Sequence, residues 1–431
     1  MNPHSIRFVW VFLLITARLV IAQPQNASFI NGDLLPNAPE LAARGSYGVG
    51  VRTINLVHSA QLDVLHQQAG KSPLYDRPLT IEIWYPAQIP ANQQPTVTYA
   101  STLGRANDPK RPLIPFTFLG RAARDAKPDP SGGAYPLVIV SHGYPGSRLL
   151  LTYLTENLAS KGYVVVAIDH TESTYGDLAG FASTLLNRPL DDGFVLNEMA
   201  RLAGKTSGSF LAGLLDTDNT AFIGYSMGGY GVLNLAGAGY SPQALKQFGQ
   251  MTGGSTALEV RTQASPVYKA SLDPRIKAVV AFAPWGMERG IWDAAGLSGL
   301  SLPTLLVGGS KDDVSGYEKG IKAIYEGAIK SERYLLTYVN ARHNVAPNPP
   351  PLASMLPGVS TDEYMHYAEP AWNEHRINNI NQHFVTAFLG LHLKKMAYRT
   401  YLDLPSPDAA EGWPGFKSRM TVGLEMRHDK P

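Results

Sequence analysis

Short apolar runs recur along the chain and alternate with longer segments in which apolar residues have a helical spacing. Such runs predict strands, and continuous ones are typical of strands buried on both faces of a parallel sheet. The predicted strands are 79–85, which is expected near the sheet edge, 137–141, 163–169, 220–225, 276–282, 304–308 and 333–339. Helical patterns cover 150–161, 192–202 and 370–401. This alternation predicts an α/β fold with a mostly parallel central sheet and helices on both faces.

Residues 46–404 contain all of these elements and are expected to form one domain. Two stretches within it, 171–218 and 239–275, are too long for plain connections and are predicted to be lid-like insertions. A polar linker, 23–45, is expected before the domain, and a tail rich in Pro and Gly, 405–431, after it.

Residues 1–22 have the pattern of a secretory signal peptide. Arg7 forms a short positive region, residues 8–22 are mostly apolar, and Val20-Ile21-Ala22 offers small or permissive residues for cleavage. Arg18 interrupts the apolar stretch, which leaves an uncleaved membrane anchor as the alternative. The stretch is short for a bilayer span of about 20 residues, and no later stretch is long and apolar enough. We therefore expect a secreted or periplasmic protein with no stable membrane insertion after cleavage.

The charge balance and the lack of cysteine narrow the classes of function. The chain has 37 Lys and Arg residues against 35 Asp and Glu residues. Removal of residues 1–22 would make the two numbers equal. The chain then has no excess of positive charge for binding nucleic acid. An uncharged small molecule therefore fits better as substrate than a polyanion. The absence of cysteine excludes disulfides, thiolate metal sites and a cysteine nucleophile.

The main chemical signal is Gly224-Tyr225-Ser226-Met227-Gly228, which has the G-x-S-x-G pattern of a nucleophile elbow. In that motif a sharp strand-to-helix turn presents the serine hydroxyl, and the glycines leave room where a Cβ would clash. Here an apolar strand leads in and a helix of small residues follows. This context predicts Ser226 as the nucleophile, and the alternative is a glycine-rich turn with an incidental serine.

A serine nucleophile needs a base, and the base needs an orienting acid. After an elbow of this kind the acid comes first along the chain and the histidine second. Asp312 and His343 follow in that order, each just after a predicted strand. We predict Ser226, Asp312 and His343 as a catalytic triad. Asp313 stays open as the acid, and either aspartate could instead cap a helix near Ser315.

The segment Ser141-His142-Gly143-Tyr144-Pro145-Gly146 follows another apolar strand, and its glycine lets backbone N–H groups turn toward the site. We predict an oxyanion hole formed by the N–H groups of Tyr144 and Met227, the residue after the nucleophile. Tyr225 and Trp285 are predicted to contact the substrate, although aromatic residues at such positions also serve packing.

No metal ion or other cofactor is expected. The sequence has no H-E-x-x-H pattern, no G-x-G-x-x-G opening a strand–helix unit and no G-x-x-x-x-G-K. His170, with Asp169 and Glu172 beside it, forms a faintly metal-like group, and its support is far weaker than that of the serine motif.

The motifs at 141–146, 224–229 (Gly-Tyr-Ser-Met-Gly-Gly), 309–313 (Gly-Ser-Lys-Asp-Asp) and 342–344 (Arg-His-Asn) resemble, in that order, those of the α/β-hydrolase superfamily. Within it, the chain is similar to bacterial relatives of the platelet-activating factor acetylhydrolases, often labelled predicted dienelactone hydrolases. DHTES (169–173) and LLNRPLDDGFVL (185–196) also resemble that family. The resemblance covers about 48–404 and implies hydrolysis of small esters with short or modest acyl groups.

Two departures limit what the resemblance implies. Tyr225 stands where the acetylhydrolases usually carry histidine, and true dienelactone hydrolases use a cysteine nucleophile, which this chain lacks. The prediction is a secreted carboxylic ester hydrolase acting through an acyl-enzyme, with lipid-type esters and polyesters both open as substrates. A serine peptidase, an acyltransferase and a non-catalytic binding module are the alternatives. Acyl specificity, alcohol specificity and oligomeric state stay undetermined.

Overall fold

The computed structural model describes residues 29–67, 73–90, 92–93, 95–405 and 412–431. The predicted signal peptide and the first part of the predicted linker, 23–28, lie outside these ranges. No helix in the described ranges is long and apolar enough to cross a membrane.

In the described part of the chain, one sheet of ten strands runs in the order β12-β11-β10-β9-β8-β6-β7-β2-β1-β5. Its centre is parallel and consists of β6 (Tyr135–Ser141), β7 (Val164–Asp169), β8 (Leu215–Tyr225), β9 (Ile276–Phe282), β10 (Thr304–Gly309) and β11 (Arg333–Tyr338). Every residue of β6, β9, β10 and β11 except Lys277 is buried, as the continuous apolar runs predict. The predicted α/β architecture is confirmed.

Antiparallel pairs, β2 with β1 and β11 with β12, flank the parallel centre, while the short edge strand β5 pairs with β1 in parallel. At one edge β1 (Gly48–Leu62) lies between β2 (Leu74–Ala87) and the short β5 (Ala123–Arg124). β2 also pairs with β7, so the strand predicted near the edge at 79–85 is an interior strand. At the other edge β12 (Leu424–Asp429) pairs with β11, within the segment whose composition suggests an irregular tail.

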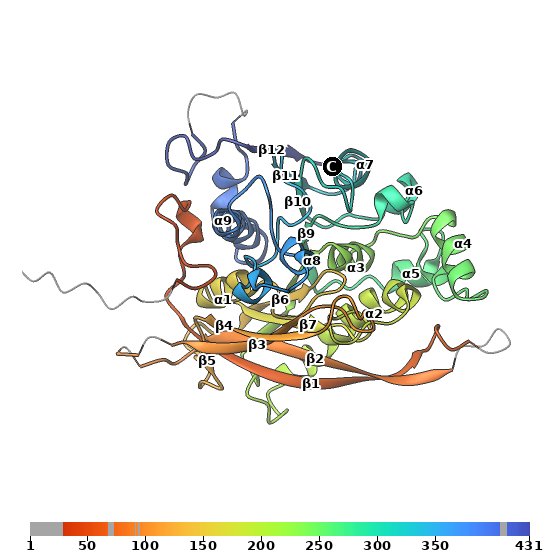
Figure 1. The fold of residues 1–431 in the computed structure, drawn as a ribbon, viewed down its shortest axis with the longest axis horizontal. Helices are drawn as coiled ribbons and strands as arrows, with labels where there is room; N and C mark the ends of the chain where they lie inside the picture. The colour runs from red at the N-terminus through yellow and green to blue at the C-terminus, as the bar shows by residue number, and fades with distance from the viewer. Residues whose placement is uncertain (1–28, 68–72, 91, 94, 406–411) are drawn as a thin grey trace, which may run out of the picture.

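Helices cover both faces of the sheet, as Figure 1 shows with α1 and α9 to one side of the strands and α2 and α3 to the other. These four are α1 (Thr152–Ser160), α2 (Phe181–Ala203), α3 (Met227–Leu235) and α9 (Glu374–Leu393). The shorter helices are α4 (Pro242–Met251), α5 (Pro266–Ala270), α6 (Ala294–Leu297), α7 (Lys322–Gly327) and α8 (Thr361–Met365). Single turns are η1 (Glu40–Ala42), η2 (Glu259–Arg261), η3 (Met287–Arg289), η4 (Tyr317–Ile321), η5 (Leu352–Met355) and η6 (Tyr398–Tyr401).

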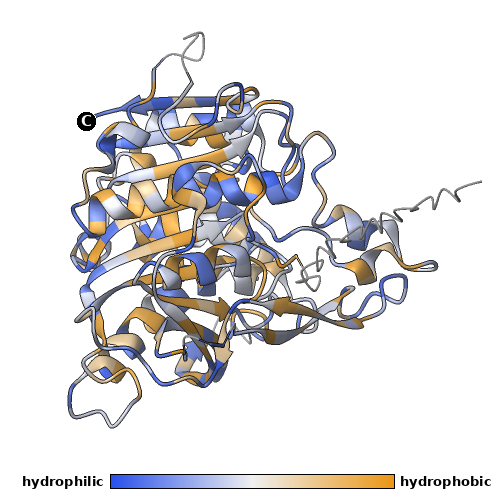
Figure 2. Cartoon of the chain, turned by 90° about the vertical axis from the view of Figure 1, so that its left-hand side faces the viewer, coloured by the Kyte–Doolittle hydropathy of each residue, from blue (hydrophilic) through white to orange (hydrophobic). Residues whose placement is uncertain are grey.

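The two long segments differ in character. Residues 171–218 contain α2, which packs on α3, β6 and β8 and buries most of its length. This stretch therefore supplies a core helix of the fold, and its lid-like character stays a prediction. Residues 239–275 carry α4, η2 and α5, which bury few side chains. Figure 2 shows hydrophobic residues concentrated in the central strands and in the helices against them. A separate hairpin of β3 (Val97–Leu103) and β4 (Ile114–Gly120) touches α1.

Candidate active site

The polar residues singled out in the sequence meet at one edge of the sheet. Ser226 follows β8, Asp312 follows β10 and His343 follows β11, while the loop with Gly143 follows β6. These strands are parallel, so their carboxyl ends lie together, which is where open α/β sheets place their ligands. All three polar side chains are nearly enclosed, because Ser226, Asp312 and His343 are only 8%, 6% and 9% exposed.

Ser226 occupies a strained turn between β8 and α3. Its φ of 52° and ψ of −110° fall in a region that residues with a side chain rarely adopt. Two bonds hold it there: its N–H donates to the Phe282 carbonyl at 2.8 Å, and its own carbonyl accepts from the N–H of Tyr230 at 3.0 Å. Close packing also fixes the turn, since a Cβ on Gly228 would lie 1.9 Å from the Ser141 carbonyl oxygen.

His343 bridges the serine and one aspartate. Its Nε2 lies 3.0 Å from Oγ of Ser226, and its Nδ1 lies 2.9 Å from Oδ2 of Asp312. The other oxygen of Asp312 accepts from the backbone N–H groups of Val314 at 2.9 Å and Ser315 at 2.8 Å. The aspartate is thereby fixed from both sides, and it holds the ring so that Nε2 faces the hydroxyl.

Asp313 has a different environment from its neighbour. It forms an ion pair with Arg342, and both side chains are about half exposed, at 47% and 46%. The Arg342 guanidinium holds the pKa of the Asp313 carboxyl below its usual range. Of the two aspartates left open by the sequence, the geometry brings Asp312 to His343.

The loop after β6 lies directly against the serine. A Cβ on Gly143 would be 3.5 Å from Cβ of Ser226 and 3.2 Å from the Tyr225 ring. Tyr144, the next residue, lines the same cavity as Ser226. Within the described residues, the N–H groups of Tyr144 and Met227 donate to no protein acceptor. The assignment of these two N–H groups to an oxyanion hole stays a prediction.

A cavity of about 290 Å³ opens over Ser226 and His343. Tyr225 is part of its wall, and burial raises the pKa of this phenol well above its usual range. The Tyr225 hydroxyl donates to Oδ1 of Asn344 at 3.0 Å, and the Asn344 amide donates to the carbonyls of Met365 and Ala368, both at 2.8 Å. Sequence reasoning missed Asn344, although its place beside His343 in the Arg-His-Asn motif was a signal.

Trp285 lies outside the lining of that cavity. It faces a neighbouring hollow of about 400 Å³ with Phe181, Leu185 and Met251. Its backbone N–H donates to the Ser226 carbonyl at 3.0 Å. Edge-on aromatic rings link the walls of the two cavities, because the ring centroid of Phe181 lies 5.2 Å from those of both Tyr144 and Trp285. A direct substrate contact for Trp285 stays a prediction.

His170 is held inside a network of polar side chains rather than in a group with Asp169 and Glu172. Its Nε2 lies 2.8 Å from Oγ of Ser141, and its Nδ1 lies 3.0 Å from Oδ2 of Asp191. Burial lowers the pKa of His170 to about 3, so the ring is neutral. Both ring nitrogens are occupied by these partners, which leaves neither of them free to bind a metal ion.

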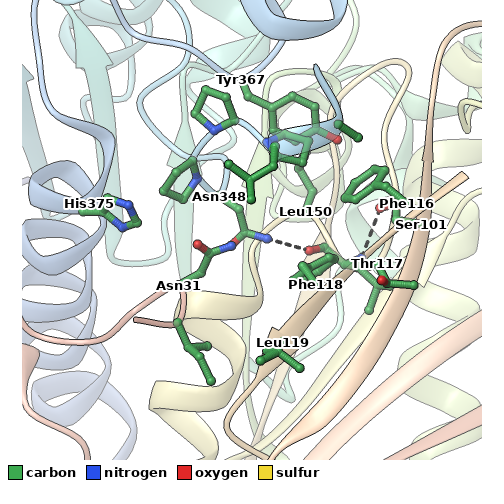
Figure 3. Close-up of a pocket in the computed structure, with 18 of the residues that line it drawn as sticks. Asn31, Ser101, Phe116, Thr117, Phe118, Leu119, Leu150, Asn348, Tyr367 and His375 are labelled. Carbon is green, nitrogen blue, oxygen red and sulfur yellow. Dashed lines mark hydrogen bonds between the residues drawn. The ribbon is translucent and has the colours of Figure 1, made fainter. Parts of the chain in front are cut away.

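A second cavity, of about 470 Å³, lies apart from Ser226 and His343. Figure 3 shows His375 on one side of it and Phe116 on the opposite side, with Asn348 between them. Asn348 is committed to its own fold contacts, because its amide donates to the Leu149 carbonyl at 2.9 Å. This cavity is larger than the one over Ser226, but the hydrogen-bonded Ser226 and His343 lie in the smaller one.

The parallel sheet, the turn with Ser226 after β8, and Asp312 and His343 after β10 and β11 define the α/β-hydrolase fold, as the sequence predicts. A search of solved structures agrees. The ferulic acid esterase from Streptomyces cinnamoneus superposes with a TM-score of 0.55 at 22% identity, covering 91% of this chain and 100% of that one.

Sequence comparisons show which known proteins this chain resembles. Residues 126–250 match the family model described as PET hydrolase-like. The cutinase est1 of Thermobifida alba is 25% identical over 215 residues, which are 50% of this chain and 55% of that protein. The bis(hydroxyethyl) terephthalate hydrolase of Streptomyces coelicolor is 25% identical over 214 residues, 49% of this chain and 52% of that protein. The chain thus spans about half the length of these curated relatives. The narrower resemblance to acetylhydrolases and predicted dienelactone hydrolases stays a prediction.

Proposed function

We propose that this protein is a serine-dependent hydrolase of carboxylic esters. The observation that carries the proposal is the hydrogen-bonded series Ser226–His343–Asp312, with links of 3.0 Å and 2.9 Å. A nucleophile, a base and an orienting acid in hydrogen-bond contact form the arrangement that acyl transfer by serine requires. The cutinases and the terephthalate ester hydrolase among the relatives support esters as the bond that is cleaved.

In the proposed reaction, Ser226 Oγ attacks the ester carbonyl carbon while its proton moves to Nε2 of His343. The tetrahedral oxyanion accepts from the N–H groups of Tyr144 and Met227. As the intermediate collapses, the alcohol leaves with the proton from His343, and an acyl-serine remains. Water then attacks the acyl-serine carbonyl carbon while its proton moves to Nε2 of His343. As this second intermediate collapses, His343 returns the proton to Ser226 Oγ and the carboxylic acid leaves. Asp312 accepts from Nδ1–H and stabilises the imidazolium at each step.

The cavity over Ser226 favours small, uncharged esters. Its volume of about 290 Å³ is at the small end of ligand pockets. Arg342 and Asp313, which line this cavity, form an exposed ion pair whose charges cancel. We propose esters with short or modest acyl chains or aromatic acids as substrates, including the ends of polyester chains, in keeping with the names of the relatives.

We also propose that the enzyme is secreted. The proposal rests on the signal-like pattern of residues 1–22. The test is to express the full chain in a bacterial host and to sequence the N-terminus of protein recovered outside the cytoplasm. A mature N-terminus near residue 23 supports the proposal, and protein that stays in the membrane with residue 1 intact refutes it.

Kinetics on p-nitrophenyl esters from acetate to palmitate, beside 4-nitroanilides of the same acids, test the function. The expected result is hydrolysis of short esters, little cleavage of anilides and loss of activity in Ser226→Ala. Ser298→Ala is a matched control, because that hydroxyl only donates to the Ala295 carbonyl at the end of α6. Preferential cleavage of anilides would favour a peptidase, and equal rates for wild type and Ser226→Ala would exclude the proposal.

A further inference from the structure

We propose that Arg188 is a positioning residue for the oxyanion hole, because it holds the peptide that presents the Tyr144 N–H to the reacting carbonyl. The inference rests on the proposed ester hydrolase function and deepens it. Arg188 belongs to the LLNRPLDDGFVL segment on α2, whose role the nucleophile and its partners leave unexplained. Its side chain is 1% exposed, so it makes no contact with solvent or with a substrate in the cavity.

The guanidinium of Arg188 binds the backbone of the loop after β6. Nη1 donates to the carbonyl of His142, and Nη2 donates to the carbonyl of Gly143 at 2.9 Å. The same Nη2 also donates to Oγ of Ser173 at 2.5 Å, so a residue outside this loop anchors the guanidinium as well. One planar guanidinium thus holds two adjacent carbonyls of the loop. The five donors of arginine have fixed directions that suit this geometry, whereas the single ammonium group of lysine does not.

Because the peptide unit is planar, the contact of Arg188 with the Gly143 carbonyl also sets the direction of the Tyr144 N–H. The carbonyl of Gly143 and the N–H of Tyr144 belong to the same peptide unit, and in a trans unit they point in opposite directions. A Gly143 oxygen held by Arg188 on the α2 side therefore turns the Tyr144 N–H away from α2. Gly143 itself lies against Ser226, since its Cβ would be 3.5 Å from the serine Cβ.

His142 reinforces the same peptide. Its Nδ1 lies 2.6 Å from the Gly143 oxygen, and its Nε2 accepts from the N–H of His170 at 3.2 Å, so Nδ1 carries the proton. Burial lowers the pKa of His142 well below its usual range, which keeps the ring neutral and the tautomer fixed. The Gly143 carbonyl therefore accepts two bonds, and such polarisation strengthens the donor at the other end of the peptide.

Two carboxylates lie near the buried Arg188. Burial lowers the pKa of Arg188 to about 10, while Asp192, one turn further along α2, and Asp191 favour its charged form. Arg77 and the His170 ring face the same carboxylates, because Asp191 accepts from Nε of Arg77 at 2.9 Å and pairs with His170 at 3.0 Å. The hydrogen bonds of Arg188 to the His142 and Gly143 carbonyls and to Ser173 offset part of the cost of burying its charge behind the loop.

The test compares Arg188→Lys and Arg188→Met with wild type on p-nitrophenyl acetate and measures inhibition by an alkylboronic acid, which mimics the tetrahedral state. Loss of one oxyanion donor lowers kcat by about 100- to 1000-fold. A misdirected donor should lower kcat by about 10- to 100-fold and weaken boronic acid inhibition by a similar factor. KM should stay within about threefold, because the substrate pocket itself is unchanged.

Arg333→Met is the matched control. Arg333 is also a buried arginine that donates to backbone carbonyls, those of Tyr325 and Ser331, but it lies at the opposite end of β11 from His343. It should lose stability without losing kcat. If Arg188→Met does not fold, Ser173→Ala removes only the outer anchor of the guanidinium and should show a smaller fall in kcat and in boronic acid affinity.

The inference is overturned if folded Arg188 or Ser173 variants keep kcat and boronic acid inhibition within twofold of wild type. It is equally overturned if Arg333→Met shows the same fall in both. Ser226→Ala, run in parallel, separates this failure from that of the proposed function: when wild type and Ser226→Ala hydrolyse the ester equally, the ester hydrolase function itself is refuted.

Discussion

The carboxylates of Asp312 and Asp313, neighbours in the chain, have opposite environments. Oδ2 of Asp312 lies 2.9 Å from Nδ1 of His343, and its carboxylate is enclosed. Asp313 is paired with Arg342 at the surface. The sharp turn after β10 separates them, because Oδ1 of Asp312 accepts from the backbone N–H groups of Val314 and Ser315 and is thereby directed inward.

This difference predicts unequal effects of the same substitution. Asp312→Asn should lower kcat on p-nitrophenyl acetate by about 1000- to 10,000-fold, because the amide can no longer hold His343 in the tautomer that accepts the serine proton. Asp313→Asn removes only a surface pair and should change kcat less than threefold and stability by less than about 1 kcal/mol. A large loss of kcat for Asp313→Asn, with Asp312→Asn unaffected, would reassign the acid.

The elbow should be intolerant of a single methyl group at Gly228. A Cβ there would lie 1.9 Å from the Ser141 carbonyl oxygen, and neither backbone can move without displacing β6 or α3. We expect Gly228→Ala to destabilise the fold by about 1–3 kcal/mol or more and to abolish activity. Urea unfolding measures the first effect. Gly249→Ala on α4 is the control, since the nearest atom is 3.9 Å away, and it should be neutral or slightly stabilising.

His383 should make the protein less stable in acid. Its Nδ1 accepts from the Leu41 N–H at 3.1 Å, so the buried ring is neutral. Burial, aided by Lys161, lowers the pKa of His383 from 6.5 to about 3. Between these values the unfolded chain binds a proton that the native protein does not, so the free energy of unfolding falls as pH falls below 6.5.

The measurement is urea unfolding of wild type and His383→Asn from pH 7 to pH 4.5. The Asn carbonyl can still accept from Leu41 but does not titrate. Wild type should therefore lose about 2 kcal/mol more than the variant over this interval. Parallel stability curves would show that His383 binds its proton equally in both states.

Tyr225 should contribute to the wall of the active-site cavity through its hydroxyl. Tyr225→Phe leaves Oδ1 of Asn344 without its donor, and Asn344 connects the His343 loop to the carbonyls of Met365 and Ala368. We expect a loss of about 1–2 kcal/mol in stability and a rise in KM that exceeds any fall in kcat. Unchanged stability and KM would show that this hydrogen bond does not shape the cavity.

The sequence was informative for strands whose residues are nearly all apolar and buried, and for site residues that directly follow a strand. The apolar runs at 137–141, 276–282 and 304–308 reappear as β6, β9 and β10 within two residues. β12 was missed because only two of its residues, Leu424 and Met426, are apolar and because it follows a Pro- and Gly-rich stretch. Its pairing with β11 is a tertiary fact that no local pattern encodes.

The candidate site divides in the same way. Ser226, Asp312 and His343 could be predicted because each follows a strand and the order along the chain is characteristic. Asp313 could not be excluded as the partner of His343, since the choice between the adjacent aspartates depends on the turn after β10. The role of Arg188 was also hidden, because a charged residue on a helix indicates a solvated face unless the packing of α2 on the loop after β6 is known.

The most direct test of the account is labelling with a fluorophosphonate, followed by mass spectrometry of the modified peptide. We predict one label per chain, on Ser226, with labelling much slower in His343→Asn and abolished in Ser226→Ala. A label on another serine, or full ester hydrolysis by a Ser226→Ala protein that takes no label there, would contradict the assignment of Ser226 as the nucleophile.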